Sequence, residues 1–142
     1  MKTETLPDKL SDLLELALDD LETTEKDPAY EINMLYWHEL DEVDNTCRVC
    51  LAGAVLAQTL EVPVSFNYLR YRPEPDLEDK MDAINFVRLG FVDYALKALN
   101  RASFYEVGKD RWRIEVPQYY IDPKRFKKTL RNLVPELRAK GY

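Results

Sequence analysis

The sequence predicts a mainly α protein of the α+β class: a compact helical domain around a central apolar helix, with a short β-hairpin near residues 104–120. Three observations predict it: leucines at helical spacing near the N-terminus, an apolar run over 49–57 with no polar face, and alternation of apolar and charged residues over 111–116. The 142 residues, 46 % hydrophobic and 32 % charged, fit one folded domain over 1–142 and exclude a disordered chain.

The first helix is predicted from about Asp8 to Glu25. Acidic residues fill the face opposite its apolar residues, and Asp27-Pro28 ends the pattern. The apolar residues keep the spacing of one buried helix face: Leu10, Leu13, Leu14, Ala17, Leu18 and Leu21. Beyond this helix, apolar residues alternate over 30–34, which predicts a short extended piece.

A second helix is predicted over about 46–60. Asn45-Thr46 is a typical N-cap pair, and the acidic stretch 39–44 before it is expected to be a loop. The helix is apolar on nearly all sides over 49–57, so we expect other elements to surround it. Cys47 and Cys50 would then share one face of its first turn.

The middle of the chain predicts an extended arm followed by a helix. Prolines at 63, 73 and 75 exclude a long helix there, and apolar residues alternate over 62–68 as in one short strand. A third helix is predicted over about 77–100, weakened near its middle by Gly90.

The last third predicts a β-hairpin around Gly108 and a final helix. Asp122-Pro123 is a strong helix start, because an N-cap Asp precedes a proline at the first helical position. Pro135 is expected to kink or split this helix. Its apolar stripe is Phe126, Leu130, Leu133 and Leu137.

Charge is distributed unevenly. Residues 1–46 carry 14 Asp and Glu against 3 Lys and Arg, whereas residues 101–142 carry 5 against 11. We expect the acidic and basic thirds to face each other within the fold. A contact across a dimer and two separate partner surfaces are the alternatives.

Cys47-x-x-Cys50 is the sequence's candidate chemical site. A helix N-terminus lowers the pKa of a thiol, which favours redox or nucleophilic chemistry, but no thioredoxin-like pattern surrounds the pair. Two thiols can also be plain core residues, which is the interpretation we favour. A metal half-site is the third interpretation.

Both chemical alternatives depend on His38, the only histidine. Zinc would need Cys47, Cys50, His38 and a carboxylate from 39–44. A hydrolase would use Cys50 or Cys47 as the nucleophile, His38 as the base, and an acid such as Asp41 or Asp44 to orient it. We expect no cofactor, no metal and no catalytic centre, and keep these residues as the alternative.

Candidate binding residues lie in three places. Trp37, beside His38, is expected to be a packing lid. The arm 66–72 could stack bases and pair phosphates, and the basic final helix could bind an acidic partner or nucleic acid. The net charge of −6 makes nucleic acid the poorer candidate. The predicted binding residues are Trp37, Tyr68, Arg70, Arg72, Lys124, Arg125 and Lys128.

An acidic N-terminal helix, Trp37-His38 and then Cys47-x-Val49-Cys50-Leu51-Ala52-Gly53-Ala54 resembles small proteins of tailed bacteriophages and prophages. The later Ala83-x4-Arg88-x-Gly90-x4-Ala95-Leu96 is similar too, so the resemblance spans roughly residues 10–100. It implies a phage origin but no mechanism.

Such a phage protein most often binds a host or defence protein, so the resemblance implies non-enzymatic binding or inhibition. A homodimer is a further option. We expect the host cytoplasm and no membrane, since residues 1–7 lack the apolar core of a secretory signal and no apolar run is long enough to span a bilayer. A cysteine- or zinc-dependent enzyme and a nucleic-acid binder are the rival functions.

Overall fold

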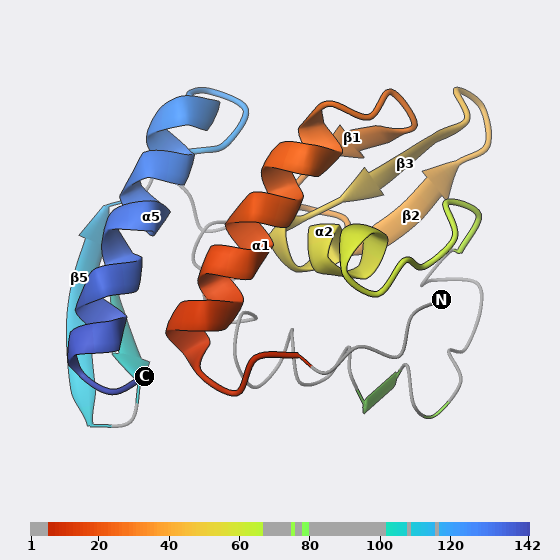
Figure 1. Ribbon diagram of the computed structural model, residues 1–142. Coiled ribbons are helices and arrows are strands. Elements are labelled where there is room, and N and C mark those ends of the chain that lie inside the picture. Colours follow the sequence, from red (N-terminus) through yellow and green to blue (C-terminus); the bar gives the residue numbers. More distant parts are fainter. Residues whose placement is uncertain (1–5, 67–74, 76–77, 80–101, 108, 116) are drawn as a thin grey trace.

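The computed structural model describes residues 6–66, 75, 78–79, 102–107, 109–115 and 117–142, and these form an α+β fold (Figure 1). The elements are α1 (Leu10–Glu25), β1 (Tyr30–Ile32), β2 (His38–Asp41), β3 (Thr46–Val49), α2 (Leu51–Gln58), β4 (Ala102–Val107), β5 (Asp110–Glu115) and α5 (Pro123–Ala139).

Helix α1 confirms the predicted first helix. All six apolar residues of the predicted face are buried, together with Ser11 and Thr24. This face packs against both α2 and α5, so α1 lies between them. Its acidic face contacts solvent and the side chains of α5.

A three-stranded mixed sheet follows α1, in the order β1-β3-β2. The parallel pair β1–β3 aligns Tyr30 with Cys47, and the antiparallel pair β2–β3 aligns His38 with Val49. The predicted extended piece over 30–34 corresponds to β1. The predicted acidic loop 39–44 is wrong in its first half, because residues 39–41 belong to β2.

The predicted helix start at 46 is also wrong. Residues 46–49 form β3, in which buried Cys47 and Val49 alternate with half-buried neighbours. Asn45 adopts a φ of 59° in the turn from β2, a left-handed conformation that Asn tolerates. The same Asn-Thr pair that is typical of a helix cap therefore closes a hairpin, and Cys47 and Cys50 do not share a helix face.

Helix α2 begins at Leu51, with Cys50 as its N-cap residue. Every residue over 51–57 is buried, as the absence of a polar face predicts. The helix contacts α1 on one side and β3 on another, and its small residues allow both to approach closely. The core is continuous from α2 through α1 to α5.

Strands β4 and β5 form an antiparallel hairpin that pairs Ala102 with Glu115 and Val107 with Asp110, in the segment where alternation predicts one. The chain over 62–66 forms no strand. The helix predicted over 77–100 lies outside the described residues apart from helical Glu78 and Asp79.

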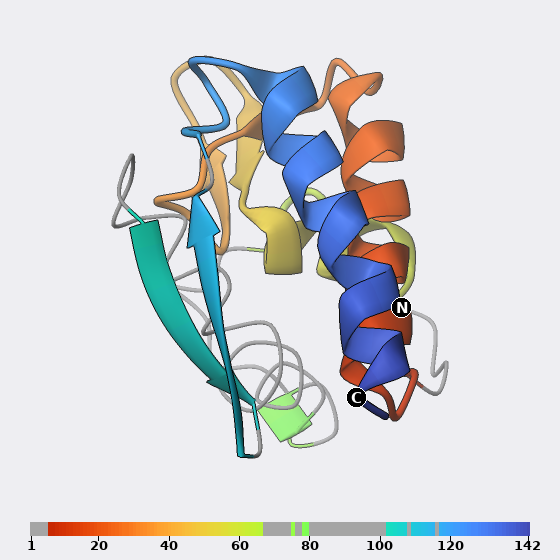
Figure 2. The same ribbon diagram turned by 90° about the vertical axis from the view of Figure 1, so that its left-hand side faces the viewer.

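Helix α5 runs antiparallel to α1, and the two helices lie side by side (Figure 2). Asp122 caps it by accepting a hydrogen bond from the Arg125 N–H at 3.1 Å. All four predicted stripe residues are buried. Of the kink or split predicted at Pro135, the split is wrong, because the helix continues through it to Ala139.

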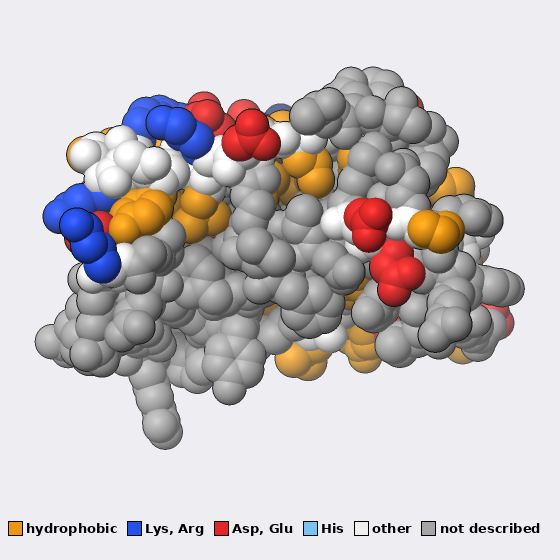
Figure 3. Space-filling model, turned by 90° about the horizontal axis from the view of Figure 1, so that it is seen from below, with side chains coloured by type: hydrophobic (Ala, Val, Ile, Leu, Met, Phe, Trp, Pro, Cys, Tyr) orange, Lys and Arg blue, Asp and Glu red, His pale blue; other side chains and the backbone are white. Residues whose placement is uncertain are grey.

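Ion pairs connect the acidic face of α1 to α5, as the charge distribution predicts. Arg131 Nη2 lies 2.8 Å from Asp19 and 3.0 Å from Glu22, and Arg138 Nη2 lies 2.9 Å from Asp12. Seen from below, cationic and acidic side chains are gathered near the end of α5 (Figure 3). The two oppositely charged thirds are thus partners within one chain.

Within the described part of the chain, no helix combines the length and the hydrophobicity that a membrane span requires.

Candidate functional site

The sheet brings together two of the three residues of the predicted chemical site. His38 begins β2, Cys47 lies on the neighbouring β3, and both are fully buried. Cys47 Sγ is 3.5 Å from His38 Nδ1, which also lies 2.8 Å from the carbonyl oxygen of Phe66. Because a carbonyl only accepts, Nδ1 carries the imidazole proton in this hydrogen bond.

Burial keeps both groups of this pair neutral. Desolvation raises the pKa of the Cys47 thiol to about 12, against a smaller lowering by a backbone hydrogen bond from Glu39. Desolvation also lowers the pKa of His38, against the opposing effect of the hydrogen bond to Phe66. At neutral pH the pair is a thiol beside an uncharged imidazole, and not the thiolate and imidazolium of a reactive cysteine.

The second cysteine has a separate structural role. Cys50 is buried at the start of α2, where its Sγ accepts a hydrogen bond from the Gly53 N–H at 3.4 Å. Both cysteines are free thiols. Among the described residues, no group of three or more His, Cys, Asp or Glu side chains is arranged to hold a metal ion.

The acids proposed to orient His38 are held by an arginine instead. Arg48 Nη2 lies 2.8 Å from Asp41 and 3.7 Å from Asp44, and its Nε lies 3.1 Å from Glu31. A backbone hydrogen bond from Val43, assisted by Arg48, lowers the pKa of Asp41. These carboxylates therefore stabilise the sheet and its turn.

A cleft of about 420 Å³, which sequence analysis did not predict, opens at the end of the sheet. It is lined by the five consecutive residues 31–35 and by Tyr119 and Tyr120. Ile32 and Met34 pack on the core, whereas Leu35 and Tyr120 are 72 % and 74 % exposed. The segment before α5 and strand β1 lie at the same end of the molecule (Figures 1 and 2).

The Tyr119 wall is firmly held. The Tyr119 hydroxyl donates a hydrogen bond to Glu25, which also pairs with Lys127 at 2.7 Å. The ring packs edge-on against Phe126, with ring centroids 5.4 Å apart. Burial and the bond to Glu25 raise the pKa of Tyr119, so the hydroxyl remains a donor. These contacts fix one side of the cleft before anything binds.

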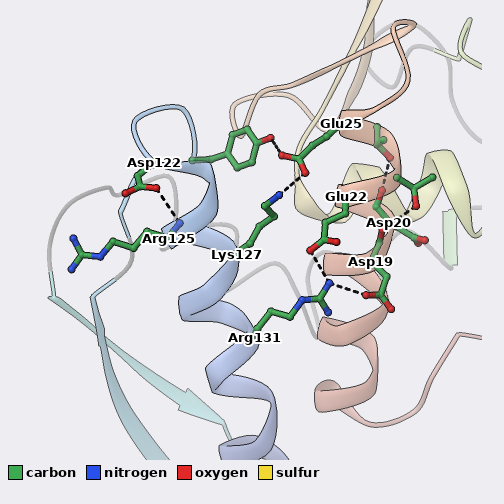
Figure 4. A network of polar contacts seen from close by, with 11 residues as sticks. Asp19, Asp20, Glu22, Glu25, Asp122, Arg125, Lys127 and Arg131 are labelled. Carbon is green, nitrogen blue, oxygen red and sulfur yellow. Dashed lines mark hydrogen bonds and ion pairs between the residues drawn. The ribbon is translucent and has the colours of Figure 1, made fainter.

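Three predicted binding residues line a second cavity, which has no lining residue in common with the cleft. Lys124, Arg125 and Lys128 line a shallow, open cavity of about 520 Å³ together with Asp122, Thr129 and Asn132. Figure 4 shows Lys127 and Arg131 directed toward α1 and Arg125 directed away from it. Among the described residues, no acidic side chain pairs with these three cations.

The remaining predicted binding residues divide into two groups. Trp37 is half-buried and packs on the core, in agreement with a packing lid. Tyr68, Arg70 and Arg72 lie outside the described residues. The sequence contains one indication of the cleft, which is a pair of short apolar clusters outside the predicted helices, at 34–37 and 119–121.

Compared with protein-family models, curated proteins and solved structures, the chain matches none.

Proposed function

We propose that this protein acts without catalysis, by binding another protein at the cleft between residues 31–35 and Tyr119–Tyr120. The observation that carries the proposal is the apolar cleft. Three cations that have no acidic partner among the described residues follow its Tyr120 closely in the chain and line a second cavity. We define the binding face as Leu35, Tyr120, Ile121, Lys124, Arg125 and Lys128.

The binding face has the features of a protein-recognition surface. Its large apolar side chains are exposed to solvent: Leu35, Tyr120 and Ile121. Burying one such side chain contributes about 1.5–3 kcal/mol to the free energy of binding. Tyrosine and arginine are the residue types that most often dominate binding energy at interfaces. The face combines an apolar centre with a charged border.

The enzymatic alternative has less support. A catalytic cysteine needs a thiolate at neutral pH, whereas burial raises the pKa of Cys47 to about 12. The acids that would orient His38 pair with Arg48. Nucleic-acid binding has less support too, because Lys127, Arg131 and Arg138 of the basic helix pair with acids of α1.

The identity of the partner is the part of the proposal that depends on the resemblance to phage proteins. On that basis we propose a host or defence protein, bound in the cytoplasm of the infected cell.

Affinity capture from a bacterial lysate tests the proposal. Wild type would be compared with Leu35→Ser/Tyr120→Ser, which removes both exposed walls of the cleft, and with Val43→Ser. Val43 is 97 % exposed in the turn between β2 and β3 and does not line the cleft, so it is a matched loss of an exposed apolar side chain.

We expect one protein to be retained by wild type and by Val43→Ser but lost by the double variant. Identical sets on all three proteins would contradict the proposal. So would a partner that the double variant retains. Thermal unfolding of each variant distinguishes loss of the face from loss of the fold.

A further inference from the structure

We propose that the part of the partner seated in the cleft is an extended, acidic stretch of polypeptide that adds a strand to the outer edge of β1. This inference rests on the proposed function and specifies what the cleft recognises. Three features support it: a strand edge that no described residue pairs with, an apolar cleft lined by residues of that strand, and cations that closely follow Tyr120 in the chain.

The open edge follows from the hydrogen bonds of β1. The Asn33 N–H donates to the Val49 carbonyl and the Cys47 N–H donates to the Ala29 carbonyl, each at 2.9 Å. In a parallel pair, alternate residues direct both backbone groups to the same side. Tyr30 and Ile32 therefore direct theirs away from β3.

Among the described residues, few of these outward groups have a hydrogen-bond partner. The Tyr30 N–H donates to the Asp27 carbonyl at 3.1 Å, which leaves the Tyr30 carbonyl and both backbone groups of Ile32. Strand order β1-β3-β2 places no neighbour on this side of β1 within the sheet. An added strand would satisfy these groups, as in other cases of peptide binding at sheet edges.

The cleft lies along this same edge. Residues 31–33 of its lining carry the main chain of β1 and its exit, and Tyr119 and Tyr120 face them. A bound strand points alternate side chains to opposite sides. Every second side chain of the segment would therefore face the apolar floor of Ile32 and Met34, which selects aliphatic or aromatic residues there.

Charge selects the flanking residues. Tyr120 is followed within a few residues by the cations Lys124, Arg125 and Lys128, and the N-terminus of α5 adds the positive end of a 17-residue helix. The two acids at this site are already engaged: Glu31 with Arg48, and Asp122 with the Arg125 N–H. A segment with Asp or Glu beside its apolar positions fits this surface.

Selection from a random dodecapeptide library on the intact protein tests the inference directly. We expect the selected peptides to alternate apolar and polar residues and to carry an acidic flank. The best peptide is then resynthesised with a single backbone N-methyl group at each position in turn. Because an added strand uses every second N–H, N-methylation should weaken binding about tenfold or more at alternate positions only.

Variants of the protein supply the matched test. Ile32→Pro removes one outward N–H, whereas the bond that the Ala29 carbonyl accepts from Cys47 and the bond that Asn33 donates to Val49 remain. It should abolish peptide binding in a protein that still unfolds cooperatively. Lys124→Glu/Lys128→Glu should weaken binding about tenfold and reverse the preference for acidic flanks. Lys109→Glu, an exposed cation in the turn between β4 and β5, is the charge control and should bind normally.

Several outcomes would overturn the inference: no selected peptide, basic flanks, or N-methyl effects that do not alternate. Dimerisation of wild type that Ile32→Pro abolishes would also overturn it, since the occupant would then be a second copy of this chain. Each of these outcomes would leave the proposed function intact if capture of the partner still depended on Leu35 and Tyr120. The proposed function would be contradicted, and the strand-addition inference would not, if the selected peptides bound as expected but no lysate protein depended on the cleft.

Discussion

The carbonyl oxygen of Trp37 occupies the position that a side chain at Gly53 would need. A Cβ built on Gly53 lies 1.9 Å from this oxygen and 3.0 Å from the Cβ of Val49. The absence of a side chain in the first turn of α2 thus allows the backbone before β2 to pass directly over the helix. Trp37 leads into His38, so this contact also positions the start of β2.

Gly53→Ala should therefore destabilise the protein. Helix propensity alone favours Ala over Gly by about 1 kcal/mol, but the clash with a backbone atom requires α2 or the 37–38 backbone to move. We expect a loss of about 3 kcal/mol in the free energy of unfolding, measured by urea denaturation. Ala57→Gly, near the other end of α2, should lose only about 1–2 kcal/mol from propensity and one methyl group. A Gly53→Ala protein as stable as wild type would refute the close approach.

The buried His38 should make stability depend on pH below neutrality. Its pKa is lowered in the folded protein, so unfolding takes up a proton wherever the unfolded imidazole is charged, and stability falls as pH falls below about 6.5. Between about pH 7.5 and about pH 5.5 the loss can reach about 1.3 kcal/mol.

Denaturant unfolding of wild type and His38→Gln at both pH values checks this effect. Since His38 is the only histidine, the variant should lack this part of the pH dependence whatever its absolute stability. An NMR titration of the wild-type imidazole should give a pKa below 6.5. An equal pH dependence in both proteins would count against a neutral buried His38.

Neither cysteine should react readily in the folded protein. Burial raises the pKa of Cys47 to about 12 and Cys50 is 2 % exposed, so iodoacetamide should label both only as fast as the protein opens. Full labelling is expected in denaturant, with mass spectrometry as the readout. Cys47→Ala should retain partner capture. Fast alkylation of the native protein would revive the cysteine-enzyme alternative.

The ion pairs between α1 and α5 should contribute unequally. The side chains of Lys127 and Glu25 are 19 % and 20 % exposed, whereas those of Arg138 and Asp12 are 49 % and 51 % exposed. Lys127→Met leaves Glu25 half-buried beside Tyr119 and should cost about 1–2 kcal/mol. Arg138→Met removes a pair exposed to water and should cost less than about 0.5 kcal/mol. Equal losses would show that burial does not determine the strength of these pairs.

Helices α1 and α5 could be predicted because each carries its own evidence. The local signals are a stripe of leucines at helical spacing in α1 and an Asp-Pro start in α5. The tertiary contacts of both helices agree with these signals. The contact between the acidic and basic thirds could likewise be predicted from the charge distribution, because segments of opposite charge within one chain attract each other.

Strand β3 could not be predicted in the same way. Its four residues are too few to show alternation, and Asn45-Thr46 before an apolar run is equally typical of a helix cap and of a tight turn. Pairing with β1 and β2 decides between them. The cleft was missed for a related reason: Leu35 and Tyr120 belong to separate segments with no shared pattern, and only folding brings them together.

The pairing of α1 with α5 has a consequence during synthesis. Glu25 and Lys127 are separated by 102 residues, so at about 5–20 residues per second the ribosome finishes the basic helix some 5–20 s after the acidic one. Throughout that interval the leucine face of α1 lacks Phe126, Leu130 and Leu137. The apolar face of α1 in the nascent chain therefore remains exposed to chaperones until α5 leaves the ribosome and packs against it.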